Sequence, residues 1–212
     1  MPSTWTRPGT VALTLLAAVA SAACAPGTAM HAAPHTDGAA AGARTQQSME
    51  GWSPASREAM AAMTAKYGAP DETTPTMAVW HDNGPWKRTI VYRDAVPHSF
   101  PMPHPDVMEQ FVDYRVPTDR YDELAMYDGS VVVMRTNGEM SARCDKEGAN
   151  LLALNLAHEI ATGRRTVDDA RRMYAEQIMA MKAGRPAPYT ERLMFTPAPG
   201  SSRDGDRPVA SR

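Results

Sequence analysis

The chain has 212 residues, of which 43% are hydrophobic, and this proportion supports a globular core and excludes wholesale disorder. Its 22 Lys and Arg residues are balanced by 24 Asp and Glu residues, so the formal net charge is only −2. Because nucleic-acid-binding domains present a strongly basic face, we expect no nucleic acid among the partners.

Residues 1–23 are predicted to be an export signal peptide. Arg7 is the only charged residue in this segment, and an apolar run follows it at residues 11–20. The run is too short to span a bilayer, which takes about 20 residues. The segment ends in small residues before a cysteine, Ser21-Ala22-Ala23-Cys24.

This ending resembles the signal of bacterial lipoprotein precursors. The resemblance implies that Cys24 becomes the acylated first residue of the mature chain, which would anchor the protein in the membrane. Ala25-Pro26 carries no acidic retention signal, so we expect an outer-membrane lipoprotein that faces the periplasm. The alternative is ordinary signal cleavage, which would release a soluble periplasmic protein.

Residues 24–50 are expected to be a flexible tether, because they are rich in Ala, Gly, Thr and Pro and have no apolar period. A single domain is predicted over residues 51–195, and a disordered tail over 196–212. Once Cys24 is acylated or removed, Cys144 is the only cysteine left, so no intramolecular disulfide can form.

The first half of the domain reads as a helix followed by strands. Ser53 as N-cap, Pro54 at the first helical position and Gly68 at the end predict a helix over 54–67. Period-two alternation then indicates strands at 77–80, 86–93 and 107–116. The four prolines of residues 95–105 predict an extended crossing without ladder hydrogen bonds.

The second half reads as a helix, a hairpin and two longer helices. We expect Thr118 to cap a short helix that ends at Tyr127. Asn137-Gly138 predicts a type I′ hairpin turn between a buried strand at 131–134 and a return strand at 139–144. The apolar period predicts a helix over 146–162 and another one after Thr166, and residues 189–195 are expected to dock as an extended segment.

This order of elements predicts an α+β fold. Sequential hairpins favour an antiparallel sheet of about five strands, made of two hairpins and a middle strand, with the helices packed on one face.

A candidate metal site lies in the proline-rich crossing. His98, Met102 and His104 have the same parity in an extended strand, so their side chains can share one face. Imidazole binds zinc and copper, and a thioether favours Cu(I), so the pattern suggests a copper or zinc site. The alternative is that the crossing is purely structural and that the two histidines cap backbone groups.

Two other candidates involve Cys144 and the first hairpin. Cys144 precedes a helix, whose N-terminus can lower the pKa of a thiol, but a nucleophile also needs a histidine that only the fold could bring close. A buried apolar thiol is the alternative. Most aromatic residues of the first hairpin are expected to pack between the sheet and its helices. His81, Trp86 and Lys87 near its turn are expected to be exposed and form a candidate surface for a partner or ligand.

His158 and Glu159 lack the second histidine that a zinc-protease motif would require at position 162. The sequence therefore favours a non-catalytic accessory module of the bacterial cell envelope, which is tethered to the membrane and binds a partner or ligand. Two alternatives stay open: a periplasmic copper- or zinc-binding protein that uses the His/Met loop, and a cysteine-dependent enzyme.

Overall fold

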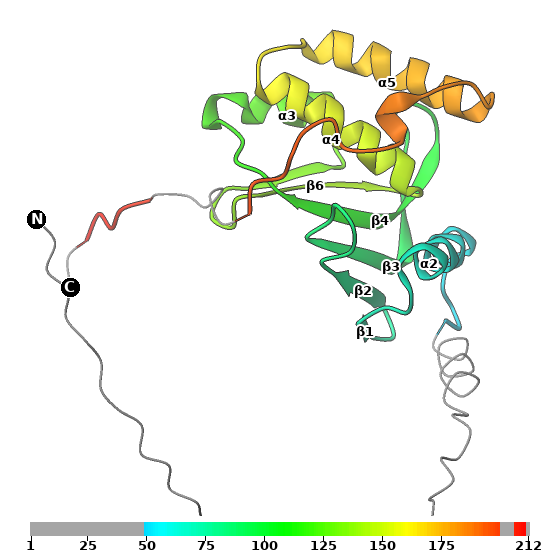
Figure 1. Ribbon diagram of the computed structural model, residues 1–212. Coiled ribbons are helices and arrows are strands. Elements are labelled where there is room, and N and C mark those ends of the chain that lie inside the picture. The colour runs from blue at the N-terminus through cyan, green and yellow to red at the C-terminus, as the bar shows by residue number, and fades with distance from the viewer. Residues whose placement is uncertain (1–48, 200–205, 211–212) are drawn as a thin grey trace, which may run out of the picture. The chain divides into compact units, whose positions relative to one another are not determined.

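The computed structural model describes residues 49–199 and 206–210 (Figure 1). The predicted signal peptide, the lipidation site Cys24, nearly all of the predicted tether and part of the predicted tail lie outside these residues. Within the described ranges, no helix has both the length and the apolar character that crossing a bilayer requires.

The fold is α+β, as predicted, and is built on one open antiparallel sheet. The strand order in the sheet is β1-β2-β3-β4-β6-β5. The strands are β1 (Glu72–Thr73), β2 (Met77–His81), β3 (Arg88–His98), β4 (His104–Asp113), β5 (Val131–Met134) and β6 (Glu139–Cys144). The sixth strand, which we did not expect, is β1; its two residues are too few to show an alternating pattern.

The helices are α2 (Pro54–Tyr67), α3 (Tyr121–Tyr127), α4 (Glu147–Ala161) and α5 (Val167–Lys182), with short 3₁₀ turns η1 (Thr118–Arg120) and η2 (Pro188–Thr190). The predicted cap of α2 is confirmed, because Ser53 Oγ accepts a hydrogen bond from the Ser56 amide. Thr166 caps α5 in the same way, through the Asp169 amide. The prediction for Thr118 was wrong: it begins η1, and no side chain caps η1 or α3.

Helices α2 and α4 pack on the same face of the sheet. The side chain of Gln110, from the middle of β4, donates to Met63 Sδ of α2 and accepts a 3.1 Å hydrogen bond from Asn150 of α4. One strand face can reach both helices only if they lie side by side on it. Two apolar clusters result, one under α2 around Trp80 and a larger one under α3, α4 and α5.

The opposite face of the sheet carries charged and aromatic side chains that pair with one another. Arg88 bonds Glu139 at 2.7 Å, and Tyr92 donates to Glu109 at 2.8 Å. The guanidinium of Arg143 lies 4.0 Å from the centre of the Tyr92 ring. These groups therefore satisfy one another on the face opposite α2 and α4.

The proline-rich crossing is a hairpin, which corrects the prediction that it forms no ladder. Strand β3 continues to His98, β4 begins at His104, and Pro97 lies directly opposite Pro105. Antiparallel pairs alternate between those that exchange N–H···O bonds and those that do not. Two opposed prolines fit the second kind, because neither residue has an amide hydrogen to donate.

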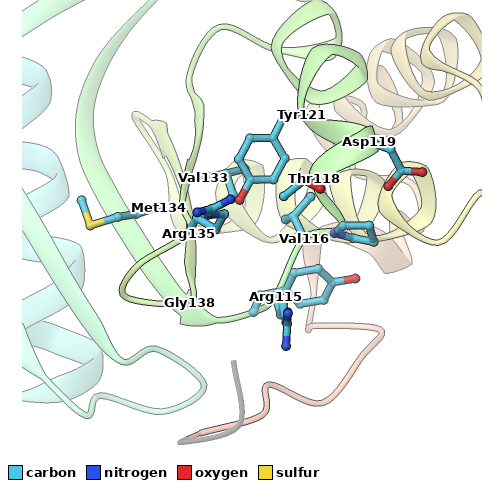
Figure 2. A pocket seen from close by; sticks show the side chains of 11 residues that line it. Arg115, Val116, Thr118, Asp119, Tyr121, Val133, Met134, Arg135 and Gly138 are labelled. Carbon is cyan, nitrogen blue, oxygen red and sulfur yellow. The ribbon is translucent and has the colours of Figure 1, made fainter. Parts of the chain in front are cut away.

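The β5–β6 hairpin forms as predicted, but two details differ. Strand β5 is the edge of the sheet, and its Val132 and Met134 are half exposed, so it is not a buried strand. The loop has four residues between the paired Met134 and Glu139. Among the described non-glycine residues only Asp82 has a positive φ, so the turn is not type I′ at Asn137-Gly138. A polar hollow of about 380 Å³ lies beside this loop (Figure 2).

Residues 189–195 dock on α4, although η2 interrupts the extended conformation that we expected. Asn155 of α4 is 1% exposed and fixes this segment with both ends of its amide. Its Nδ2 donates to the carbonyls of Tyr189 and Arg192 at 3.0 and 2.8 Å, and its Oδ1 accepts from the Met194 amide at 2.6 Å.

Candidate metal centre

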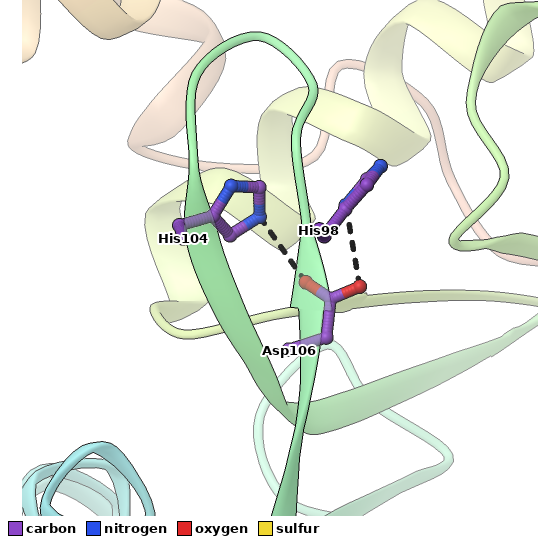
Figure 3. Close-up of side chains that lie close together, drawn as sticks. All are labelled: His98, His104 and Asp106. Carbon is purple, nitrogen blue, oxygen red and sulfur yellow. Dashed lines mark ion pairs between the residues drawn. The ribbon is translucent and has the colours of Figure 1, made fainter.

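The tip of the β3–β4 hairpin brings two histidines and an aspartate together (Figure 3). His98 and His104 are directly paired across the two strands, and their ring centres are 4.9 Å apart. Asp106 follows His104 by two residues on β4, so its side chain lies on the same face of the strand. The local cause is the hairpin register, which the sequence pattern did not reveal.

The carboxylate of Asp106 lies between the two imidazoles. Its Oδ2 is 3.2 Å from His98 Nδ1, and its Oδ1 is 3.1 Å from His104 Nε2. One potential ligand atom from each residue can be chosen so that all three lie within 4.8 Å of one another. Among described residues this is the group of histidine and acidic side chains whose spacing fits a metal ion.

Three atoms of this cluster are buried and make no hydrogen bond of acceptable geometry: His98 Nδ1, His104 Nε2 and Asp106 Oδ1. The distances are short enough for ion pairs, but the angles are not those of hydrogen bonds. Buried polar atoms are nearly always hydrogen-bonded, so each exception calls for an explanation. A cation bound between these nitrogen and oxygen atoms would give each of them a partner.

The second nitrogen of each imidazole faces an oxygen atom. His104 Nδ1 is 2.8 Å from the carbonyl oxygen of Met102, which can only accept, so Nδ1 carries the hydrogen and Nε2 faces Asp106. His98 Nε2 is 3.7 Å from Asp128 Oδ1. Asp128 is itself held by the Ser130 amide and hydroxyl, at 2.9 and 2.8 Å. Metal-binding histidines are typically oriented by such oxygen partners.

Burial makes the charges of this cluster strongly interdependent. Asp106 is 5% exposed and Asp128 2%. The pKa of His104 is raised to about 11, first by Asp106 and then by Cys144, against the opposing effect of burial. Burial raises the pKa of Asp128, although hydrogen bonds from Ser130 and the charge of His98 oppose that rise. The Asp106 carboxylate oxygen 3.1 Å from His104 Nε2 therefore favours the protonated form of His104.

The structure places the third residue of the predicted metal set differently. Met102 contributes its backbone carbonyl to His104, while its sulfur lies 2.9 Å from the ammonium of Lys182 on α5. Sequence reasoning missed Asp106 and Asp128. Asp106 could have been recognised, because it lies two residues after His104 and so faces the same side of an extended strand. Asp128 follows α3 and is brought close only by the tertiary fold.

Cys144 lies next to the cluster, because β6 pairs with β4 and places Cys144 opposite Met108. It is 4% exposed, and burial raises the pKa of its thiol, although His104 lowers it in part. Its Sγ donates a 3.5 Å hydrogen bond to Asp145. The fold thus supplies the nearby histidine that a nucleophilic cysteine needs, but burial works against the thiolate that would attack.

The three residues of the predicted partner surface do not form one exposed patch. Trp86 is corrected from exposed to buried: it is 2% exposed, and its Nε1 donates to Glu147 at 2.7 Å. Lys87 is 2.8 Å from both Asp113 and Glu139. His81 is the exposed member, and it pairs with Glu72 at 2.7 Å.

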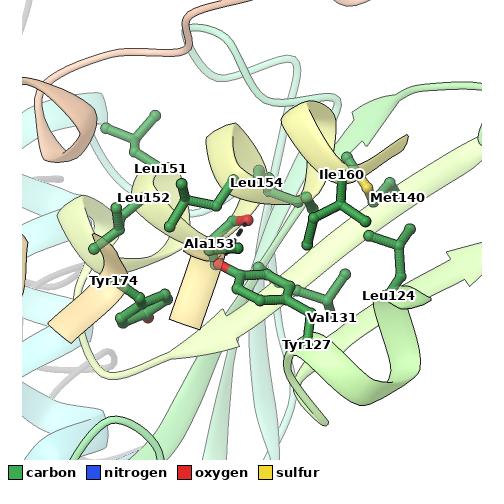
Figure 4. Packing of buried hydrophobic residues seen from close by; sticks show 14 of the residues in the cluster. Leu124, Tyr127, Val131, Met140, Leu151, Leu152, Ala153, Leu154, Ile160 and Tyr174 are labelled. Carbon is green, nitrogen blue, oxygen red and sulfur yellow. Dashed lines mark hydrogen bonds between the residues drawn. The ribbon is translucent and has the colours of Figure 1, made fainter. Parts of the chain in front are cut away.

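A cavity of about 300 Å³ adjoins the cluster, between the hairpin tip and α5. His104 and Cys144 belong to its lining. Tyr174, which lies in the apolar core against α4, forms part of another wall (Figure 4). One member of the cluster, His104, therefore lines a pocket with a largely apolar wall.

No protein-family model, no curated protein and no solved structure matches this chain.

Proposed function

We propose that this protein binds one divalent transition-metal ion through His98, His104 and Asp106. The observation that carries the proposal is that one atom from each residue is buried, faces the others and lacks a hydrogen bond. The ligand atoms would be His98 Nδ1, His104 Nε2 and a carboxylate oxygen of Asp106.

The donor set favours zinc over Cu(I). Two imidazole nitrogens and one carboxylate oxygen suit Zn²⁺, whereas Cu(I) prefers thioether and thiolate sulfur. The only thioether predicted for the site, that of Met102, lies against Lys182. Three protein ligands leave room for a further ligand on the metal, which is typical of zinc sites that bind water or a small molecule.

The oxygen partners of the imidazoles support the same proposal. Met102 O fixes which nitrogen of His104 faces Asp106, and Asp128 stands behind His98. These contacts would hold both rings in the orientation that a metal needs before it binds. A simple ion pair between Asp106 and one histidine would need neither of them.

We further propose that the protein works in the cell envelope, tethered through Cys24, as a periplasmic metal-binding protein. This part of the proposal depends on the sequence of residues 1–24. A partner-binding accessory role is less well supported, because Trp86 is buried and the charged groups on the uncovered sheet face pair with one another.

The test is a metal titration of the full chain. Chelator-treated protein is titrated with Zn²⁺ against a chromophoric competitor, and Co²⁺ is used to report the ligand geometry through its visible spectrum. We expect one ion per chain, with binding abolished in His104→Ala and in Asp106→Asn. His81→Ala is the matched control, since His81 is an exposed histidine that pairs with a carboxylate, and it should bind normally.

Two results would overturn the proposal. One is the absence of stoichiometric binding for Zn²⁺, Co²⁺ and Cu²⁺. The other is binding that persists unchanged in the His98/His104 double alanine variant, which would place the ion elsewhere. Circular dichroism of each variant shows whether the fold is retained.

A further inference from the structure

The cavity beside the metal centre has the build of a small-molecule site. Its volume of about 300 Å³ lies at the lower end of the range for ligand pockets. The hairpin tip contributes Pro101 and Pro103 to its wall, and α5 contributes Tyr174, Ile178 and Met181. Its lining also includes His104, so an occupant would lie next to a proposed metal ligand.

One positive charge at the edge of this cavity, that of the solvent-exposed Lys182, has no negative partner. The ammonium of Lys182 lies 2.9 Å from the sulfur of Met102, which is an uncharged and weak acceptor. Among the described residues, no carboxylate lies within ion-pair distance of Lys182. The other lysine of the cavity, Lys146, is already paired with Asp145 at 2.8 Å and with Glu58 at 3.6 Å.

The start of α4 also borders the cavity, and the charges of its Asp145 and Lys146 balance each other at 2.8 Å, so only the helix N-terminus itself adds positive character. Asp145, Lys146 and Ala149 line it, and Lys146 occupies the N-cap position without a side-chain hydrogen bond to the helix. The amide groups of an uncapped first turn carry the positive end of the helix dipole. This contribution supports an anionic occupant, and the unpaired Lys182 gives that anion a specific partner.

We propose that the cavity binds a small organic acid with a hydrocarbon body. Its carboxylate pairs with Lys182, and its body lies against Tyr174 and Ile178, beside His104. An inorganic anion would leave the apolar wall without a partner, and an uncharged hydrocarbon would gain no ion pair with Lys182, which is exposed at the edge of the cavity. That the acid lies beside a metal depends on the proposed function, whereas its binding to the cavity does not.

The experiment uses hexanoate as the probe and the full chain, first without metal. Affinity is measured by calorimetry or by shifts in NMR spectra for acetate, butyrate, hexanoate and the uncharged hexanol. We expect the affinity to rise by about four-fold for each added CH₂ group that becomes buried. Because Lys182 is exposed, its ion pair is a surface pair, and we expect Lys182→Met to weaken hexanoate binding about two- to five-fold and to leave hexanol binding nearly unchanged.

Lys146→Met is the matched control, because it removes a lysine from the same cavity whose charge is already paired. It should change hexanoate affinity less than two-fold. The proposal is overturned if millimolar hexanoate does not bind, if Lys182→Met and Lys146→Met have equal effects, or if acetate binds as tightly as hexanoate.

A second arm separates this proposal from the metal proposal. Hexanoate added to the Co²⁺-loaded protein should change the cobalt spectrum, because the acid lies beside His104. Hexanoate binding that is retained in metal-free protein, together with a failure to bind Co²⁺, would refute the metal centre and support the cavity. Stoichiometric Co²⁺ binding without hexanoate binding would refute the cavity alone.

Discussion

Replacement of Glu147 tests how the start of α4, which borders the cavity, is held against the rest of the fold. The carboxylate of Glu147 is reached by three donors. Trp86 Nε1 donates to it at 2.7 Å, Tyr67 OH donates to it at 2.6 Å, and Lys66 forms an ion pair with it. Trp86 is 2% exposed, so its indole N–H has no access to bulk water.

The expected cost of Glu147→Ala follows from these contacts. A hydrogen bond to a charged group contributes about 1.5–3 kcal/mol, and a buried donor left without a partner costs about 1–3 kcal/mol. The Lys66 side chain is 54% exposed, so its ion pair adds only about 0–1 kcal/mol. These contributions overlap, and we expect the free energy of unfolding to fall by about 2–4 kcal/mol.

The loss should depend on pH in a defined direction. Burial alone would raise the pKa of Glu147, but hydrogen bonds from Lys66, Tyr67 and Trp86 outweigh it, and the pKa is lowered from 4.5. A carboxyl with a lowered pKa stabilises the fold above its unfolded pKa, and this stabilisation is lost as pH falls through the folded value. The difference between wild type and Glu147→Gln should therefore shrink in acid.

The assay is urea unfolding followed by tryptophan fluorescence at pH 7 and in acid. Glu58→Ala is the control, since the Glu58 side chain is 71% exposed and its ion pair is 3.6 Å long. It should cost no more than about 0.5 kcal/mol. A cost for Glu147→Ala as small as that of the control would refute the reasoning about the buried donors.

Three further predictions concern the metal centre and the thiol. Zinc at 100 times its Kd should stabilise the fold by about 2.7 kcal/mol and raise Tm by roughly 5–11 °C. Thermal melts with and without a chelator measure this shift, and an unchanged Tm would count against specific binding. Asp128→Asn should weaken zinc binding roughly 10–100-fold in the competitor titration without abolishing it, because Asp128 only orients His98; unchanged affinity would remove Asp128 from the site. Iodoacetamide should alkylate Cys144 at neutral pH at least about ten-fold more slowly than a free thiol, because burial raises the thiol pKa. Alkylation faster than that of a free thiol would instead support the hypothesis of a cysteine-dependent enzyme.

The helix boundaries could be predicted because their causes are local. Ser53 and Thr166 accept hydrogen bonds from amides three residues ahead, so the residues that begin each helix are neighbours in sequence. The apolar period after Thr166 likewise predicted α5, whose buried residues include Ala170, Tyr174 and Ile178. The failures at Thr118 and at Asn137 are also local, since several turn geometries are compatible with the same few residues.

The candidate metal site was only half visible in the sequence. His98 and His104 stood out because they are histidines in a short stiff segment, but their pairing across β3 and β4 depends on a register that the prolines concealed. The side chain of Met102 would share a face with those of His98 and His104 only if the chain stayed extended through residue 102. Because the chain turns between His98 and His104, that condition is not met.

The sequence by itself determined the α+β class, most of the helices and hairpins, and two of the three proposed metal ligands, because caps, turns and periodic apolar residues act over a few positions. The tertiary structure decided which groups meet. It placed Asp128 behind His98, Cys144 beside His104 and Lys182 above Met102, although these partners are separated by many residues along the chain. Burial then shaped their chemistry, since it raises the pKa of both the Asp128 carboxyl and the Cys144 thiol.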